Sequence, residues 1–312
     1  MKKVLIAILM ATYNGEKYIS AQIESLLKQT FSEFVLWVSD DCSTDSTWEI
    51  LTTYAEQYPD KIKITQRKQN SGSAKYNFLE MMIDIKNDYV MLCDQDDVWL
   101  PDKIEKTLVK MEEMEERFGS DVPILVHTDL RVVDNNLEMI TPSFRWAMHS
   151  DFNRIAFHQV LIQNTVTGCT VMYNQALAGV LDCEPLYCVM HDWWLQLVAA
   201  AFGKIGHLDE STVLYRQHGN NAVGAKNVRK WSYRINRFIH GNEVKEAINV
   251  TYLQAKSFLQ AYYEQLNESQ RKTVEKYCAI PTKWKLGKWY AACELKAFKN
   301  GLSRNIAYFW FI

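Results

Sequence analysis

The fold is decided by residues 89–99, which read YVMLCDQDDVW. The first five are apolar or aromatic, as in a buried strand, and three carboxylates follow within four positions. Carboxylates this close repel one another, so the cluster needs water, a cation or hydrogen-bond donors beside it. A solvated acidic turn is the simpler alternative, because residues 101–103 read PDK, which is typical of a helix start.

Outward from this stretch, the first half of the chain repeats a strand–loop–helix pattern. Such repeats predict an α/β fold, with a mostly parallel sheet flanked by helices. Polar clusters at 12–14, 40–41 and 94–97 each follow a predicted strand, and ligands bind at the carboxyl ends of parallel strands. We therefore expect the three clusters to converge on one site. The predicted strands are 4–10, 34–39, 62–65, 89–93, 124–129 and 213–218, and the predicted helices are 18–28, one ending near 58, 74–85, 102–118 and 191–201.

Length and composition bound the class of protein. The 312 residues are 48% hydrophobic, which is enough for one large α/β domain with an appendage. No uncharged apolar run reaches 18 residues, so we expect no transmembrane helix, and the apolar N-terminus leads into ATYNG rather than a cleavage site. Seven cysteines without a CxxC pair favour a reducing cytosol. The spacing of Cys183, Cys188 and His191 matches no familiar zinc pattern.

Charge is distributed unevenly along the chain. From Lys226 to the C-terminus there are 16 Lys and Arg against 6 Glu and no Asp, a net charge of +10, whereas the preceding residues carry 19 basic and 31 acidic residues, a net charge of −12. A polar, glycine-containing stretch at 219–224 precedes this change, which suggests domains at 1–224 and 225–312. The basic tail suits a polyanion, either membrane headgroups or nucleic acid.

Four motifs in order resemble the inverting nucleotide-sugar glycosyltransferases of family 2, which have the GT-A fold. They are ATYNG at 11–15, SDDCSTD at 39–45, DQDDVW at 94–99 and HDWW at 191–194. The resemblance covers roughly the first 220 residues. HDWW together with YRQHGNN at 215–221 is similar to bacterial rhamnosyltransferases of cell-wall and capsule polysaccharide assembly, including streptococcal ones. The GT-A fold, with a helical C-terminal extension, is thus the expected architecture.

The resemblance implies roles for the acidic motif. A nucleoside diphosphate sugar carries a charged leaving group, and Mg²⁺ or Mn²⁺ held by carboxylates would neutralise it. By position in the motif, Asp96 is expected to bind the metal with help from Asp97, and Asp94 to face the ribose. Gln95 is given no role.

The first two motifs are expected to hold the nucleoside. In the family this loop wraps the base and ribose, so Thr12, Tyr13 and Asn14 are nucleotide-binding candidates, with Tyr13 stacking on a pyrimidine or only covering the strand end. Asp40 or Asp41 would accept the pyrimidine N–H, or cap the following helix.

Lys75 lies where the family places a basic residue. There it would approach the donor phosphates as a point charge. An exposed helix lysine is the alternative.

The last motif is expected to act on the acceptor. Asp192 is the predicted general base, taking a proton from the attacking hydroxyl, with a helix cap as the alternative. The family often has Glu-Asp here, so His191 departs from the pattern. His191, Trp193 and Trp194 are acceptor candidates, although both tryptophans suit a core equally well.

Two residues at the end of the last predicted strand are further donor candidates. Arg216 would bind the diphosphate, and His218 would complete the metal shell or reach the diphosphate. Both assignments follow their position at the end of the catalytic body.

The predicted activity is transfer of a sugar, by resemblance L-rhamnose from dTDP-rhamnose, to a lipid-linked glycan. A UDP-hexose transferase of the same fold is the alternative. A nucleic-acid-binding protein lacks a supporting motif, and a catalytically dead scaffold conflicts with the intact carboxylates. Aromatics and lysines at 284–290, with aromatics at 307–312, suggest peripheral binding to the inner face of the membrane, from the cytoplasm. Packing on the body or in a homodimer is the alternative.

Overall fold

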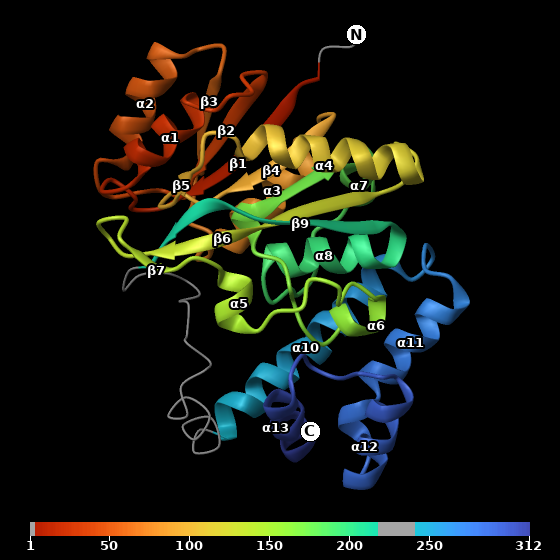
Figure 1. Cartoon of the computed structure of the whole chain (residues 1–312). Coiled ribbons are helices and arrows are strands. Elements are labelled where there is room, and N and C mark those ends of the chain that lie inside the picture. Colours follow the sequence, from red (N-terminus) through yellow and green to blue (C-terminus); the bar gives the residue numbers. More distant parts are fainter. Residues whose placement is uncertain (1–3, 218–240) are drawn as a thin grey trace. The chain divides into compact units, whose positions relative to one another are not determined.

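The computed structural model describes residues 4–217 and 241–312, which form two compact units (Figure 1). Of these residues, 4–144, 166–184 and 202–217 belong to the first unit, and 145–165, 185–201 and 241–312 belong to the second. Two segments that the sequence assigned to the first domain, 145–165 and 185–201, therefore belong with the C-terminal helices.

The first unit is built on one sheet of nine strands, with the order β3-β2-β1-β4-β8-β6-β9-β5 and β7 beside β6. The strands are β1 (Ile6–Thr12), β2 (Phe34–Asp40), β3 (Ile62–Gln66), β4 (Tyr89–Cys93), β5 (Val98–Trp99), β6 (Ile124–Val133), β7 (Met139–Thr141), β8 (Val171–Asn174) and β9 (Lys204–Arg216).

The two halves of this sheet differ in strand direction. Strands β3, β2, β1 and β4 are parallel throughout, as the repeated pattern predicts. Strand β8 then runs antiparallel between β4 and β6, and β5 and β7 also pair antiparallel, so the second half is mixed. The reversal arises because β8 is not reached through a βαβ crossover, and only such crossovers impose a parallel partner.

Strand register sets the position of the site. Thr12 pairs with Asp40 across β1 and β2, and Met10 pairs with Cys93 across β1 and β4. All residues of β1 and β4 are buried, so both faces of these strands are packed, and a slip of one residue would exchange side chains between the two faces and disrupt that packing. The three strands consequently end at the same edge of the sheet, where their polar loops meet.

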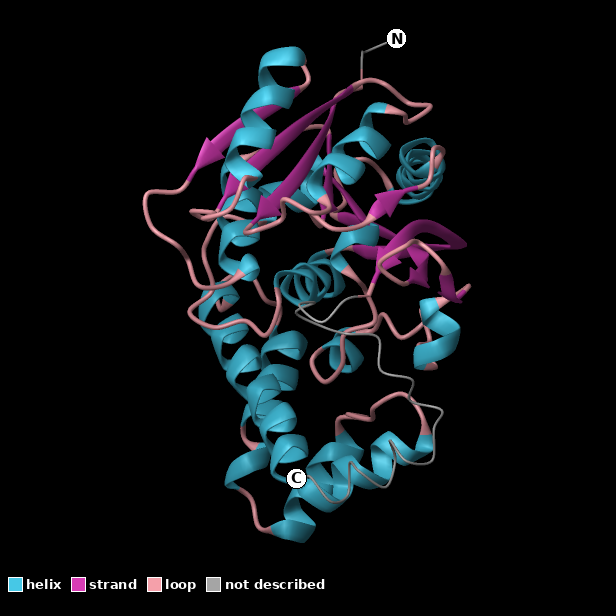
Figure 2. Cartoon of the chain, turned by 90° about the vertical axis from the view of Figure 1, so that its left-hand side faces the viewer, coloured by secondary structure: helices cyan, strands magenta, loops and turns pink. Residues whose placement is uncertain are grey.

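Helices lie against the sheet of the first unit (Figure 2). Helix α4 illustrates their amphipathic pattern, since Ile104, Leu108 and Met111 are buried at helical spacing. The helices of this unit are α1 (Ile19–Leu27), α2 (Thr47–Gln57), α3 (Ala74–Asp84), α4 (Lys103–Phe118) and α7 (Gln175–Val180), with a 3-10 turn η1 (Gly168–Thr170) and the start of α5 (Phe144–Met148).

The second unit is helical and has its own aromatic core. Trp194 lies with its ring centroid 5.5 Å from that of Phe258 and 6.0 Å from that of Tyr262. Its elements are α6 (Phe157–Val160), α8 (His191–Phe202), α10 (Gly241–Tyr262), α11 (Glu268–Cys278), η2 (Ile280–Thr282), α12 (Lys285–Glu294) and α13 (Leu302–Phe311). Across both described ranges, no helix combines the length and the apolar character needed to cross a bilayer.

Candidate active site

Asp40 and Asp41 lie where the first two loops meet, and both carboxylates accept hydrogen bonds from other residues of the chain. Asp40 is fully buried; its Oδ1 accepts from the hydroxyls of Thr12 (2.9 Å) and Ser43 (2.5 Å). Its Oδ2 accepts from the Ser43 N–H at 3.0 Å and from Gln66 Nε2 at 3.1 Å. Four donors use the four acceptor directions of a carboxylate. Asp40 therefore ties together the ends of β1, β2 and β3.

Asp41 holds the next loop instead of a helix. Its Oδ1 accepts from the Ser71 N–H at 2.7 Å, its Oδ2 accepts from the Ser71 hydroxyl at 2.8 Å, and Arg67 Nε lies 3.4 Å from Oδ1. The predicted capping role of Asp40 or Asp41 is wrong, because the backbone N–H of Thr47 at the start of α2 donates to Asp45 at 3.0 Å. The base-binding role of either aspartate stays a prediction.

The loop after β1 presents an aromatic ring on a fixed backbone. Asn14 has φ = 47°, a left-handed conformation that asparagine tolerates, and its Oδ1 accepts from the Thr44 N–H at 2.8 Å. The Asn14 N–H donates to the Ser43 hydroxyl at 2.9 Å. Tyr13 is 48% exposed. This geometry suits the predicted stacking of Tyr13 on a base.

The acidic loop after β4 is anchored by its last carboxylate. Asp97 has no exposed surface, and its Oδ1 accepts from the Arg216 N–H at 3.1 Å. Among the described residues, Oδ2 has no hydrogen bond of ordinary geometry, and the weak S–H donor of Cys169 lies near the carboxyl group. Burial, followed by the charges of Asp94 and Asp96, raises the pKa of Asp97 well above its ordinary value.

Arg216 acts on the same loop from β9. It is 5% exposed; its Nε donates to the Asp96 carbonyl at 2.9 Å and its Nη1 to the Asn135 carbonyl at 2.5 Å. Its guanidinium lies 4.9 Å from the centroid of the Tyr18 ring. Arg216 thus holds the backbone of the acidic loop through these hydrogen bonds, and its contact with a diphosphate stays a prediction.

Oxygen ligands for a cation are present in this loop. Within the described ranges, one group of potential ligands consists of Asp94, Asp97 and Cys169, whose ligand atoms lie within 4.8 Å of one another. Burial raises the pKa of the Cys169 thiol well above its ordinary value, so it stays protonated and is a poor ligand for a hard cation. Asp96 is outside this group. Asp94 and Asp96 are both partly exposed, unlike Asp97, so they face solvent from which a cation would enter.

Two buried residues near the acidic loop were missed by the sequence reasoning. Cys169 follows Gly168 in an apolar stretch, where nothing marks it as a neighbour of Asp97. Lys103 was interpreted only as part of a helix start, yet it is fully buried, with Nζ 3.4 Å from Thr212 Oγ1 and 4.6 Å from the Trp99 ring centroid. Burial lowers the pKa of Lys103 to about 8, although the nearby acidic groups, Asp97 among them, act in the opposite direction. A lysine is almost never fully buried unless a group of opposite charge lies nearby, so its burial points to the acidic loop.

Asp97→Asn is expected to stabilise the first unit at neutral pH. The asparagine keeps an oxygen for the Arg216 N–H but does not ionise. Because the folded-state pKa of Asp97 is raised, the wild-type protein loses stability as pH rises from the unfolded-state pKa through the raised value, by about 1.4 kcal/mol for each pH unit between the two. Thermal unfolding without divalent cations at pH 5 and pH 8 should show a variant whose advantage grows with pH. An advantage that does not change with pH contradicts this.

The remaining donor candidates are Lys75 and His218. Lys75 lies in the first turn of α3, with Nζ 4.8 Å from the centroid of the Tyr76 ring, and its role at the diphosphate stays a prediction. His218 lies outside the described residues.

The predicted acceptor residues lie in the second unit, at the start of α8. Asp192 is 8% exposed, and its Oδ1 accepts from the Trp193 N–H at 2.6 Å, so it does bind a free N–H of the helix start. Burial lowers the pKa of His191 to about 3, which keeps its ring neutral. Trp193 donates its indole N–H to the Val160 carbonyl at 2.7 Å. Trp194 has no exposed surface and belongs to the core, so its assignment as an acceptor contact is corrected.

Curated proteins with similar sequences include bacterial proteins that are named as glycosyltransferases. The chain is 29% identical over 237 residues to the Shigella flexneri protein named dTDP-rhamnosyl transferase RfbG, covering 72% of this chain and 77% of RfbG. It is 30% identical over 229 residues to TuaG of Bacillus subtilis (strain 168), which carries the name of a teichuronic acid biosynthesis glycosyltransferase; 72% of this chain and 83% of TuaG are covered.

Solved structures share the fold. S. aureus TarS 1–349 in complex with UDP-GlcNAc matches with a TM-score of 0.58 at 19% identity, covering 93% of this chain and 80% of the TarS 1–349 chain. The mannosyltransferase PcManGT from Pyrobaculum calidifontis, in complex with GDP-Man and Mn²⁺, matches with a TM-score of 0.53 at 15% identity, covering 98% of this chain and 82% of PcManGT. The predicted GT-A fold is confirmed. A family model described as Glycosyl transferase family 2 matches residues 7–178, more than half of the chain, and the protein belongs to that family.

Proposed function

We propose that this glycosyltransferase is an inverting, metal-dependent enzyme that moves L-rhamnose from dTDP-rhamnose to a lipid-linked glycan of a cell-wall or capsule polysaccharide. The observation that carries the catalytic part is the convergence of three polar loops at the ends of β1, β2 and β4, one of them holding three carboxylates. The rhamnosyl donor is supported by the similarity to the protein named dTDP-rhamnosyl transferase RfbG.

The donor would lie across the three loops. Tyr13, exposed on a fixed backbone, would stack on the pyrimidine, and Thr12 and Asn14 belong to the same loop. Asp94 would face the ribose, as the family motif implies. Lys75 and Arg216 are proposed to add positive charge toward the diphosphate.

The carboxylates fit a divalent cation. Mg²⁺ and Mn²⁺ prefer oxygen ligands, and Asp96 and Asp94 supply partly exposed carboxylates while Asp97 supplies a buried oxygen without an ordinary hydrogen bond. When bound, the cation would supply charge neutralisation for the departing nucleoside diphosphate. Asp97 and Arg216 would keep the loop in one conformation.

Asp192 would work on the acceptor. Inversion needs one carboxylate to remove the proton from the acceptor hydroxyl while its oxygen attacks the anomeric carbon, with the nucleoside diphosphate leaving from the opposite side. Oδ1 of Asp192 holds the Trp193 N–H, which would orient the carboxylate. His191, neutral because of its burial, adds no competing charge.

A donor panel tests this function. Purified protein with Mg²⁺ or Mn²⁺ is given dTDP-rhamnose, UDP-glucose, UDP-galactose and UDP-GlcNAc, and released nucleoside diphosphate is measured. Preferential use of dTDP-rhamnose is expected. Release from a UDP-sugar with none from dTDP-rhamnose would support the alternative, a UDP-hexose transferase of the same fold.

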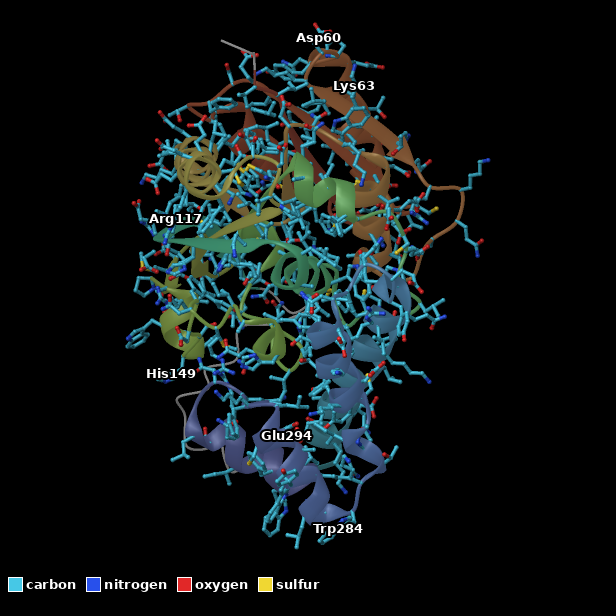
Figure 3. The ribbon with its side chains drawn as sticks, turned by 90° about the vertical axis from the view of Figure 1, so that its right-hand side faces the viewer. Asp60, Lys63, Arg117, His149, Trp284 and Glu294 are labelled. Atoms are coloured by element: carbon cyan, nitrogen blue, oxygen red, sulfur yellow. The ribbon has the colours of Figure 1, made fainter. Side chains whose placement is uncertain are left out.

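The second unit offers a surface suited to the proposed membrane-bound acceptor. On α13, Leu302 (78% exposed), Ile306 (52%) and Trp310 (67%) follow one another at helical spacing on one face. Trp284, just before α12, and Tyr290, in the middle of α12, are 70% and 72% exposed, and Trp284 lies at the tip of the helical ribbon (Figure 3).

The end of α13, which carries Trp310, lies against the start of α12, which follows Trp284. Lys285 Nζ donates to the carbonyls of Trp310 at 2.5 Å and Ile312 at 3.1 Å, which joins the start of α12 to the end of α13. Lys283 and Lys288 flank these aromatics in sequence, and residues 241–312 carry 11 basic and 6 acidic residues. Exposed aromatics among lysines are typical of peripheral binding to an anionic leaflet, so we propose association at the cytoplasmic face of the membrane.

Binding to anionic liposomes, weakening as salt rises, is therefore expected. Each surface lysine contributes about 1 kcal/mol near an anionic membrane and only within a screening length. Replacing Lys283, Lys285 and Lys288 with glutamate should reduce co-sedimentation about tenfold or more without reducing transfer to a small soluble acceptor.

A matched control separates position from net charge. Glutamate at Lys256, Lys272 and Lys276 changes the charge equally, but these exposed lysines lie on α10 and α11. An equal loss of liposome binding in both triple variants would mean that binding depends on net charge alone and not on the position of the lysines. Binding to neutral liposomes as strong as to anionic ones, or none to either, would favour the alternative that this surface packs in a homodimer, which a sizing column would reveal.

A further inference from the structure

The side chain of Gln95 joins two of the loops of the site. Its Oε1 accepts the backbone N–H of Tyr13 at 2.9 Å, and its Nε2 donates to the backbone carbonyl of the same residue at 3.0 Å. Both polar atoms of the amide are therefore used on a single residue 82 positions away. Because one atom must accept and the other donate, only an amide of this length satisfies the pair.

The backbone opposite Gln95 leaves room for this amide. A Cβ atom on Gly15 would lie 2.4 Å from Gln95 Oε1 and 2.7 Å from its Cδ, closer than real Cβ atoms approach. Gly15 is thus required for close approach, and any larger residue there would displace the carboxamide.

The other side of the Tyr13 loop is held by the loop before α2. The Gly15 N–H donates to the Thr47 hydroxyl at 2.8 Å, and the Glu16 N–H donates to Asp45 at 3.2 Å. Gln95 closes the remaining side. Hydrogen bonds therefore hold the backbone of the Tyr13 loop from both sides, while nearly half of the Tyr13 surface stays open to solvent.

We infer that Gln95 is a positioning residue that fixes the distance between the aromatic platform for the base and the carboxylates for the diphosphate. It lies between Asp94 and Asp96 in sequence. The loop that would bind the diphosphate of the donor therefore also positions Tyr13, which would bind the base of the donor. The ligand class is a pyrimidine nucleoside diphosphate. Its base and its diphosphate are a set distance apart, so the two loops that bind them must be held at a matching distance. This inference rests on the proposed function of the site.

A double-mutant cycle tests the coupling. The variants are Gln95→Met, which keeps the length of the side chain without its polar atoms, Tyr13→Ala, and both together. Affinities for dTDP and UDP are measured by calorimetry with Mn²⁺. Each single change should weaken binding about tenfold, the effect of a lost base stack. If Gln95 acts through Tyr13, the double variant should be weakened about tenfold as well, and not a hundredfold.

Kinetics separate positioning from a loss of stability. The KM for the donor should rise about tenfold in Gln95→Met, while kcat at saturating donor stays within about threefold. Gln270 is a matched control, since its partly exposed amide also accepts from a backbone N–H, that of Asn267, and donates to a backbone carbonyl, that of Ala201. Gln270→Met should change the melting temperature comparably and leave the donor KM unchanged.

Three outcomes would overturn the inference. Additive losses in the double variant would mean that Gln95 does not act through Tyr13. Unchanged affinity in Gln95→Met, with weaker binding in Tyr13→Ala, would refute the coupling and leave the proposed base site standing. Unchanged affinity in both single variants would refute the base site and the inference together.

Discussion

Replacing Asp96 with asparagine is expected to abolish sugar transfer and to remove the dependence of nucleotide affinity on divalent cations. The motif places Asp96 at the metal, and the structure leaves its carboxylate partly exposed while Arg216 holds its backbone carbonyl. The substitution preserves size and that backbone contact but removes the charge. Calorimetry with dTDP and UDP, with and without Mn²⁺, should show metal-dependent affinity in the wild-type protein and little in the variant. The loss of transfer should be about a thousandfold or more, as for other preorganised charge stabilisation.

A control variant is available six residues further along the chain. Asp102 sits at the exposed start of α4 in an ion pair with Lys106 at 2.8 Å, so Asp102→Asn removes the same charge outside the proposed site. It should retain transfer within a factor of about two, since exposed ion pairs contribute little. Unchanged metal-dependent affinity in Asp96→Asn would exclude Asp96 from the metal shell and shift the assignment to Asp94 and Asp97, whose carboxylates the structure brings together.

The parallel half of the sheet could be predicted from local sequence, and the mixed half could not. Strands β1, β2 and β4 are largely buried runs and β3 is a short, mostly exposed one; amphipathic helices separate them, and that alternation by itself implies parallel pairing. Strand β8 pairs with β4, about 80 residues earlier, in the opposite direction, and β5 has two residues. Neither a long-range antiparallel pairing nor so short a strand leaves a periodic signal.

The position of the candidate site followed from sequence because strand ends converge. The hydrogen bonding and burial of the site residues could not be predicted, because both depend on partners that are distant in sequence. Asp40 reads as a free carboxylate, yet its four donors come partly from Gln66 and Thr12, on two other strands. Gln95 carried no signal, since its partner lies 82 residues earlier. Hydrogen-bond partners of this kind are set by register, which composition does not encode.

Asp192→Asn should leave donor affinity unchanged and reduce turnover by about 10²–10⁴-fold, the effect of losing a general base. The asparagine oxygen can still accept the Trp193 N–H that Asp192 Oδ1 accepts at 2.6 Å, so the start of α8 should persist. Only the capacity to take a proton is lost. The measurement compares kcat for transfer with the calorimetric affinity for dTDP, alongside the melting temperature.

The two roles of Asp192 give opposite patterns in this experiment. If Asp192 served only the helix start, the asparagine would replace it fully and turnover would stay within a factor of a few, with the base elsewhere. If it is the base, stability and donor binding hold while turnover falls, and Asp192→Ala adds a loss of stability of about 1 kcal/mol from the missing helix-start acceptor. Asp151 provides the control in the same unit, because its Oδ1 accepts the Asn153 N–H at 3.0 Å in an exposed turn. Asp151→Asn should preserve that turn and full turnover, so a fall confined to Asp192→Asn identifies proton removal as the function of this carboxylate.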